Sequence, residues 1–304
     1  MTQLLNALPG ALAQGLIWGV MAIGVYITYK VLDIADLTVD GSICTGAAVC
    51  TMLLLGGQSP WLALLCAVLA GVLAGAVTGL LHVGLGIPPI LAGILTQMVL
   101  WSVNLKLLGK ANQALPARTT PVLLSQMDVG GALPVLLGFC VVLVALLVLF
   151  FGTELGCALR ATGCNPVMSR AQGVNTGLMK VIGLALSNGV VALSGALLCQ
   201  YQGYTDVNMG RGAVVIGLAA VVIGQAVLGR RGGRMAVQLG GVILGAVIYY
   251  IVYQVIIFAS FDTDLLKMFS AVVVAVFLGA PHVKAQLKAH SRSKKGDSGH
   301  AENE

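Results

Sequence analysis

Long apolar runs recur along the whole chain and are separated by short polar segments. A run of about 20 apolar residues can cross a bilayer as a helix. The runs predict about nine spans, at residues 11–29, 38–55, 61–83, 90–103, 133–151, 177–200, 213–228, 235–258 and 265–278. The predicted fold class is therefore all-α, a polytopic membrane helix bundle. It forms one transmembrane domain over residues 1–280, followed by a tail over 281–304.

The order of the predicted spans suggests an internal repeat. Spans one to four and six to nine each give a full span, a polar connector, a short glycine-rich span and two further spans. The two connectors are alike, DLTVDGSICTGAA at 36–48 and DVNMGRGAVVIGLAA at 206–220. Because a single span separates the halves, they would face opposite ways, as an inverted repeat of four spans around a central span. Glycine-broken segments at matching positions are typical of a transport pathway.

Composition and charge agree with a membrane protein and indicate its orientation. Of the residues, 58% are hydrophobic and 9% are charged, against about 25% charged in soluble domains. With the tail in the cytoplasm, twelve of the 17 Lys and Arg lie on the cytoplasmic side, as the positive-inside rule requires. The net charge of +6 is therefore explained by the orientation of the chain in the lipid bilayer, and no nucleic-acid partner is predicted. The tail at 281–304 is poor in apolar residues and is predicted to be disordered, basic and cytoplasmic.

Candidate chemistry inside the spans is sparse. The acids Asp36, Asp40 and Asp206 are expected at span edges, so the spans themselves hold almost no charged residues. Such an absence of intramembrane charge favours a rigid-body gate driven from outside the bilayer. No metal site is predicted, because the seven cysteines are scattered without zinc spacing. The chain has no GxxxxGK[ST] loop, so any ATP would be bound by another chain. The following polar residues are candidates for a translocation pathway, although helix packing is the commoner explanation for Ser187 and Ser194: Asp40, Gln97, Ser187, Ser194 and Gln200.

A polar island at residues 152–176 separates two apolar runs and contains a short helix with both ends marked. Asn165 is a suitable N-cap, Pro166 fits the first helical position, and Gly173 can close the helix in the left-handed conformation. About seven helical residues remain, too few for stability alone in water. The helix is therefore expected to rest on something else.

The run GCALRATGCNPVMSRAQGVNT at 156–176, followed by ALSNGVVALSGALL at 185–198, resembles the cytoplasmic coupling segment of ABC-importer permeases of the branched-chain amino acid and ribose type. The resemblance extends from Glu154 to Leu228. It implies a non-enzymatic permease subunit whose helix near 165–173 docks on a separate ATPase chain, which would hold the ATP and Mg. The implied coupling residues are Arg160, Thr162, Gly163, Asn165, Pro166, Met168, Ser169, Arg170, Gly173 and Asn175.

The same resemblance implies the partners and the location. The partners are a second permease copy, most simply in a homodimer with the pathway at its interface, and an extracytoplasmic substrate-binding protein. Asp206, Asn208 and Arg211, on the predicted outer side, are candidates for contact with that binding protein. The location is the bacterial plasma (inner) membrane, multi-pass, with a cytoplasmic C-terminus. The DLTVDGS stretch resembles more closely the subgroup paired with periplasmic-type amino-acid-binding proteins, which favours an amino acid or related solute.

Two other functions stay open on the sequence. An ion-gradient-driven secondary carrier would also explain an inverted repeat, but it would usually carry intramembrane carboxylates. A membrane scaffold without transport would not need a capped helix or glycine-broken spans. Transport by this chain alone on an ion gradient would favour the carrier.

Overall fold

The computed structural model describes residues 2–116, 120–228 and 234–258, together with Val272, Ala275 and Gly279. The chain divides into two units, Met1–Val255 and Ile256–Glu304, and the account below concerns the first. The predicted tail and, apart from Val272 and Ala275, the predicted ninth span lie outside the described residues. The count of nine spans therefore stays a prediction.

The prediction of an all-α membrane bundle is confirmed. Among the described residues, six helices are long and apolar enough to cross a membrane, and two shorter apolar helices accompany them. The helices are α1 (Thr2–Tyr26), η1 (Ile27–Val31, a π-helical turn), α2 (Val39–Leu55), α3 (Pro60–Gly84), α4 (Pro89–Leu108), α5 (Val129–Gly152), α6 (Glu154–Cys164), α7 (Pro166–Ala171), α8 (Thr176–Gln202), α9 (Ala213–Leu228) and α10 (Met235–Phe258). Two short strands, β1 (Asn112–Ala114) and β2 (Tyr204–Asp206), pair antiparallel.

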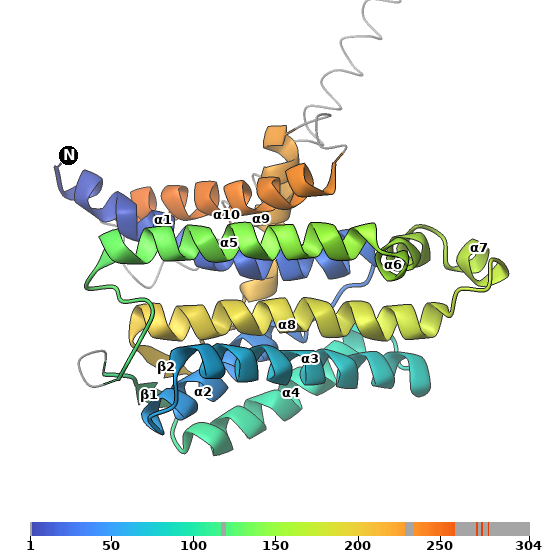
Figure 1. Cartoon of the computed structure of the whole chain (residues 1–304), viewed down its shortest axis with the longest axis horizontal. Helices are drawn as coiled ribbons and strands as arrows, with labels where there is room; N and C mark the ends of the chain where they lie inside the picture. The colour runs from blue at the N-terminus through green and yellow to red at the C-terminus, as the bar shows by residue number, and fades with distance from the viewer. Residues whose placement is uncertain are drawn as a thin grey trace, which may run out of the picture. The chain divides into compact units, whose positions relative to one another are not determined.

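Helix α8 lies at the centre of the bundle and packs against α1, α2 and α3 (Figure 1). It runs antiparallel to α1, because Ser194 Oγ donates to the Ile17 carbonyl and Ser187 Oγ to the Gly24 carbonyl. The first residues of α1 and helix α7 accordingly lie at opposite ends of the bundle (Figure 1).

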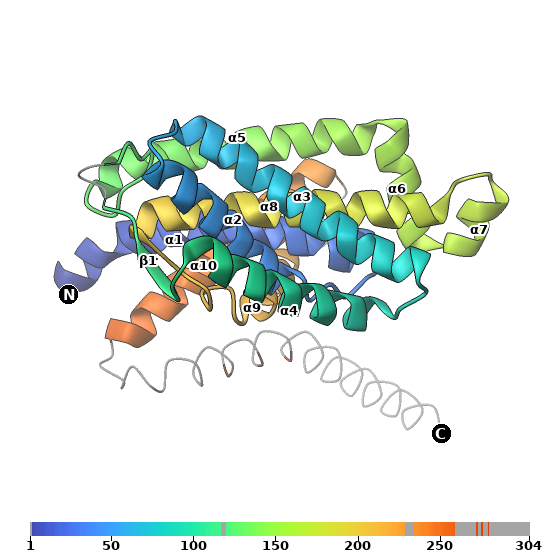
Figure 2. The ribbon, with the colours of Figure 1, turned by 90° about the horizontal axis from the view of Figure 1, so that it is seen from below.

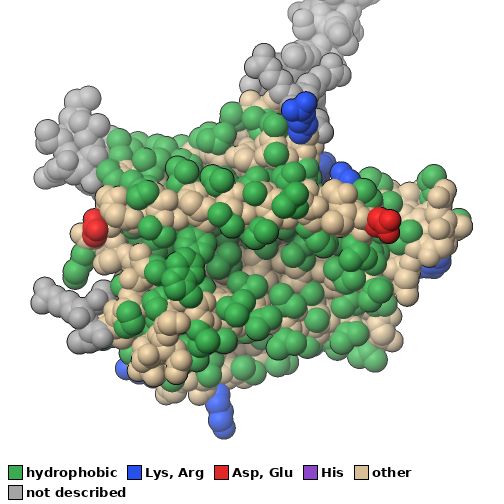
Figure 3. Space-filling view, in the orientation of Figure 1, with side chains coloured by type: hydrophobic (Ala, Val, Ile, Leu, Met, Phe, Trp, Pro, Cys, Tyr) green, Lys and Arg blue, Asp and Glu red, His purple; other side chains and the backbone are tan. Residues whose placement is uncertain are grey.

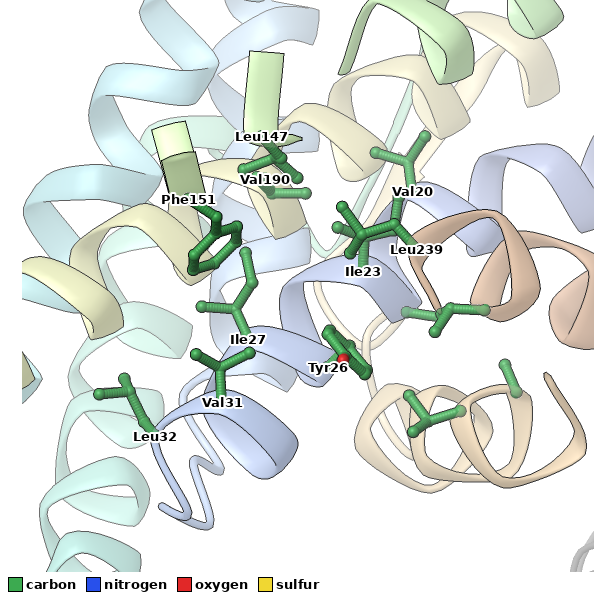
Figure 4. Close-up of a cluster of buried hydrophobic side chains, with 14 of the residues drawn as sticks. Val20, Ile23, Tyr26, Ile27, Val31, Leu32, Leu147, Phe151, Val190 and Leu239 are labelled. Atoms are coloured by element: carbon green, nitrogen blue, oxygen red, sulfur yellow. The ribbon is translucent and has the colours of Figure 1, made fainter. Parts of the chain in front are cut away.

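A buried apolar cluster holds α1 against its neighbours. Ile23, Ile27 and Val31 meet Phe151 from α5 and Val190 from α8 (Figure 4). In the most apolar window of α5, by contrast, only 22% of the residues are buried. Hydrophobic side chains are spread over the whole face drawn in Figure 3, and charged ones are few. An apolar outer surface with few charges is what a lipid-facing bundle requires.

Glycines let α2 approach α8 at backbone distance. A Cβ at Gly46 would overlap the Ala192 carbonyl, and a Cβ at Gly195 would overlap the Ile43 carbonyl. Small residues at helix contacts are the usual means of packing helices in lipid. Helix α2 is thereby held against α3, α4 and α8 (Figure 2).

The element order follows the predicted repeat as far as the structure describes it. A long helix (α1 or α8) leads through a non-helical connector to a short apolar helix (α2 or α9), with α5 between the two series. Helix α6 was not predicted, since the segment was expected to hold one short helix only. Its signal was present in the sequence, because Thr153 accepts from the Gly156 amide as an N-cap and Glu154 occupies the first turn.

Candidate functional site

The two shorter apolar helices, α2 and α9, meet at their N-termini. Asp40, in the first turn of α2, places one carboxylate oxygen 3.0 Å from the Gly212 amide and the other 3.0 Å from the Val214 amide. These amides begin α9, whose first-turn N–H groups lack helical partners. The carboxylate also opposes the positive end of the α9 dipole. Asp40 therefore fixes α9 against α2.

A second carboxylate, that of Asp36, accepts a backbone amide at the start of α2. Asp36 Oδ1 accepts from the Thr38 amide at 2.8 Å, and Asp36 Oδ2 accepts from Asn188 Nδ2 at 2.7 Å. Asn188 Oδ1 in turn accepts from Ser42 Oγ at 2.6 Å. Each short helix thus has an acidic side chain at its N-terminal end.

The depth of this network follows from α8. Asn188 is the thirteenth residue of the 27-residue α8, so it lies close to the middle of a helix about 40 Å long. Asp36 is hydrogen-bonded to it and only 5% exposed. Asp36 thus lies at the N-terminal edge of α2, as expected, but this edge is inside the bundle, because the connector before α2 folds back and brings the carboxylate to mid-depth.

Three threonine hydroxyls extend the polar region toward α3 and α4. Thr38 Oγ1 lies 2.8 Å from Thr78 Oγ1, which donates to Thr96 Oγ1 at 3.0 Å. All three side chains are buried. The hydroxyls satisfy one another, so this chain joins the start of α2 to α3 and α4.

A cavity of about 600 Å³ opens beside the first turns of α2. It lies between α2, α4 and the turn that leads to α9, and Asp40, Gln97 and Arg211 are among its lining residues. Two of the five pathway candidates, Asp40 and Gln97, are thus brought together. Asn104 also lines this cavity, and its amide nitrogen and oxygen have no partner among the described residues.

The other pathway candidates lie elsewhere. The hydroxyls of Ser187 and Ser194 are fully buried and bonded to α1 carbonyls, which favours the packing role. Gln200 accepts from the Leu123 amide at 3.0 Å and donates to Cys50 Sγ at 3.4 Å. It lines a separate cavity of about 400 Å³ near the end of α8.

The three candidates for binding-protein contact lie in and after β2. Asp206 Oδ1 accepts from the Asn208 amide at 2.7 Å, and Asn208 Oδ1 lies 3.4 Å from Trp101 Nε1. Arg211 is exposed beside the 600 Å³ cavity. Asn208 and Arg211 are therefore close to α4 and to the cavity as well as to the surface.

The predicted short helix is present as α7, with the predicted ends. Asn165 Oδ1 accepts from the Val167 and Met168 amides, Pro166 is the first residue, and Gly173 has φ +85°. The helix has six residues, one fewer than predicted. It projects beyond α6 and the start of α8 (Figure 2).

Most of the predicted coupling residues form contacts within the segment or with the helices on either side of it. Arg170 Nη2 donates to Thr176 Oγ1 at 3.0 Å, and Arg160 Nη2 donates to the Phe151 carbonyl at 3.1 Å. Asn175 caps α8 through the Leu178 amide. Thr162 and Ser169 are buried, so their hydroxyls are not offered to a partner.

The exposed tip of α7 is apolar. Val167 is 78% and Met168 is 60% exposed. Met168 was predicted from the sequence and Val167 was not, although both follow directly from the helix start at Pro166. Gly163 has a different function, because a Cβ there would overlap the Val31 carbonyl. It allows α6 to touch the end of η1, from which the connector to Asp36 begins.

Short helices that meet at mid-depth beside a cavity are typical of one class of proteins, the membrane transport permeases. The chain belongs to the family of permease components of branched-chain amino acid transport systems, whose model matches residues 8–280. It is 37% identical to a tyrosine transport system permease protein of Clostridioides difficile (strain R20291), over 93% of this chain and 94% of that protein.

Other relatives agree with this family. The chain is 33% identical to the uncharacterized protein RP368 of Rickettsia prowazekii (strain Madrid E), over 91% of this chain and 98% of that protein. It is 29% identical to the autoinducer 2 import system permease protein LsrC of Escherichia coli (strain K12 / DH10B), over 67% of this chain and 60% of that protein. No solved structure matches the chain significantly.

Proposed function

We propose that this chain is the permease subunit of an ATP-driven importer for an amino acid, with α7 docking on a separate ATPase chain. Membership of the permease family supports the class, and the tyrosine transport relative supports the solute. The observation that carries the docking role is the geometry of α7. It is a rigidly capped helix whose exposed tip is apolar, which is typical of the centre of a protein interface.

The connection from α7 to the bundle is short. Arg170 ties α7 to the start of α8, and Gly163 lets α6 rest on the Val31 carbonyl. From Val31 the connector reaches Asp36 and the mid-depth contact between the short helices. A displacement of α7 would therefore act on α8 and on the connector before α2, which are elements of a rigid-body gate.

The remaining partners belong to the same proposal. A second copy of the chain would complete the pathway in a homodimer, and an extracytoplasmic binding protein would deliver the solute. The protein would lie in the bacterial inner membrane with a cytoplasmic C-terminus. ATP and Mg would be held by the ATPase chain only.

The test is co-purification of the tagged chain with candidate ATPase subunits, for the wild type and for Val167→Asp with Met168→Asp. Charges at the apolar tip should abolish capture, because they would be desolvated in the interface without partners. Met127→Asp is the matched control, since Met127 is also exposed (81%) but lies in the loop before α5. Equal capture by all variants would exclude α7 as the docking element.

The mid-depth position of Asp36 gives a specific reason to test the carrier alternative as well. Intramembrane carboxylates are common in proton relays. Transport into liposomes by this chain alone, driven by an ion gradient without ATP, would replace the importer with a secondary carrier. Dependence of transport on the ATPase chains and ATP would exclude it.

A further inference from the structure

The close-packed helices α2 and α8 each carry a cysteine at the same place in their contact. Cys50 follows Gly46 by four residues, and Cys199 follows Gly195 by four. Each cysteine therefore lies one turn further along the face that its glycine presents to the other helix. A Cβ at either glycine would overlap the backbone of that helix. The two thiols are thus brought together, and they share a hydrogen bond.

This sulfur contact is internal to the bundle. Both side chains are fully buried, and Gln200 Nε2 donates to Cys50 Sγ at 3.4 Å. The other two buried cysteines, Cys44 and Cys140, have backbone groups as their partners. A disulfide requires Cα atoms about 4.4–6.8 Å apart, a separation that neighbouring helices reach only where their backbones approach closely. The glycine contacts between α2 and α8 provide such an approach.

The pair lies near one end of the bundle. Cys199 is three residues before the end of α8, and Cys50 is five residues before the end of α2. Beside them, Thr51 Oγ1 lies 2.6 Å from Thr205 Oγ1 in β2. This end of α8 is opposite to the end at which α7 projects (Figure 1). If α7 docks on a cytoplasmic ATPase chain, the pair is on the extracytoplasmic side, where disulfides form and persist.

We propose that Cys50 and Cys199, which are free thiols in this structure, form a disulfide that joins the ends of α2 and α8. The two thiols lose two protons and two electrons as the Sγ–Sγ bond forms. A disulfide oxidant accepts them by thiol–disulfide exchange and is reduced to two thiols. The exchange takes place as α2 and α8 pack, or through the cavity of about 400 Å³ that Gln200 lines next to Cys50.

This inference rests on the proposed function only for the orientation of the chain. It adds a covalent link between two helices that are 149 residues apart at the bonded positions. With the bond closed, the linked ends of α2 and α8 move as one unit. A gate movement transmitted from α7 would then displace them together at this end of the bundle.

The test is a count of free thiols on the full chain, expressed in a host with an oxidising extracytoplasmic compartment. Membranes are dissolved directly in denaturant with N-ethylmaleimide and without reductant. In the wild type, five of the seven cysteines should be alkylated. Cys50→Ala and Cys199→Ala should each have all six remaining cysteines alkylated. Cys66→Ala is the matched control, because Cys66 lies on α3, and only four of its six cysteines should be alkylated.

Peptide mapping of the wild type identifies the bond. A linked fragment that contains Cys50 and Cys199 and separates on reduction is expected. Alkylation of all seven cysteines would overturn the proposal, and so would a loss of two thiols that persists in Cys50→Ala. The count is made in denaturant, so it does not depend on whether a variant folds. ATPase capture by the wild type, measured in parallel, tells failure of this inference apart from failure of the proposed function.

Discussion

Two fully buried asparagines, one on α8 and one on α4, predict opposite effects of the same substitution. Asn188 on α8 bonds to Asp36, to Ser42 and to the Leu184 carbonyl. Asn104 on α4 bonds to no described residue. Leu has the same number of side-chain heavy atoms as Asn, branched at Cγ in the same way, and brings no polar atom, so replacing each by Leu removes the hydrogen bonds with little change of shape.

The magnitude for Asn188→Leu follows from the two contacts outside its own helix. Interhelical hydrogen bonds in a membrane protein average about 0.6 kcal/mol, so two of them give a lower estimate of about 1 kcal/mol. A bond to a charged acceptor contributes about 1.5–3 kcal/mol, and with Ser42 the upper estimate is about 4 kcal/mol. The upper value is favoured, because the buried Asp36 carboxylate loses its bond from Asn188 and keeps only Thr38 as a partner among the described residues.

Asn104→Leu should stabilise the protein. The substitution removes an unsatisfied buried amide, whose desolvation costs about 1–3 kcal/mol. The assay is thermal unfolding of the purified protein in one detergent, with the midpoint compared among the wild type and both variants. Asn188→Leu should lower the midpoint and Asn104→Leu should raise it. A shift of the same sign and size in both variants would refute the assignment of polar contacts to these two residues.

Three further substitutions test the backbone contacts and the acidic cap. Gly163→Ala should lower ATP-driven transport and thermal stability, since its methyl group would overlap the Val31 carbonyl, whereas Gly84→Ala, with open space around it, should change neither. Asp40→Ala should destabilise by about 0.5–2 kcal/mol, as loss of an N-cap does, measurable as a lower thermal midpoint; an unchanged midpoint would mean that α9 does not depend on Asp40. Gly195→Ala should lower the thermal midpoint by at least as much, because the methyl group would meet the Ile43 carbonyl. A midpoint equal to that of the wild type would show that α2 and α8 can move apart without loss of stability.

Much of the fold could be predicted because membrane spans and helix caps are local signals. The apolar runs predicted α2 to α5 and α8 to α10 within about five residues, whereas α1 begins at Thr2, well before the predicted start at residue 11. Asn165, Pro166 and Gly173 predicted α7. The apolar pattern does not predict α6, because its eleven residues are moderately polar. The N-cap at Thr153 is the local signal from which this helix can be predicted.

The position of Asp36 could not be predicted in the same way. A carboxylate in a polar connector is ordinarily at the membrane surface, and nothing local indicates that the connector folds back into the bundle. Asn188 is 152 positions away along the chain, so the partner that brings Asp36 to mid-depth is a tertiary contact. The same holds for Asn104, whose lack of partners depends on where α2 and the turn before α9 happen to lie.

The two acids explain why short helices can begin at mid-depth at all. A helix N-terminus exposes several unpaired amides and a partial positive charge, which a lipid environment cannot satisfy. In many transporters such ends bind an anionic group of the solute. Here Asp36 and Asp40 supply the negative charge from the protein itself, so both helix ends are already neutralised. Because Asp40 both caps α9 and lines the cavity, a change at the cavity would act directly on the contact between α2 and α9.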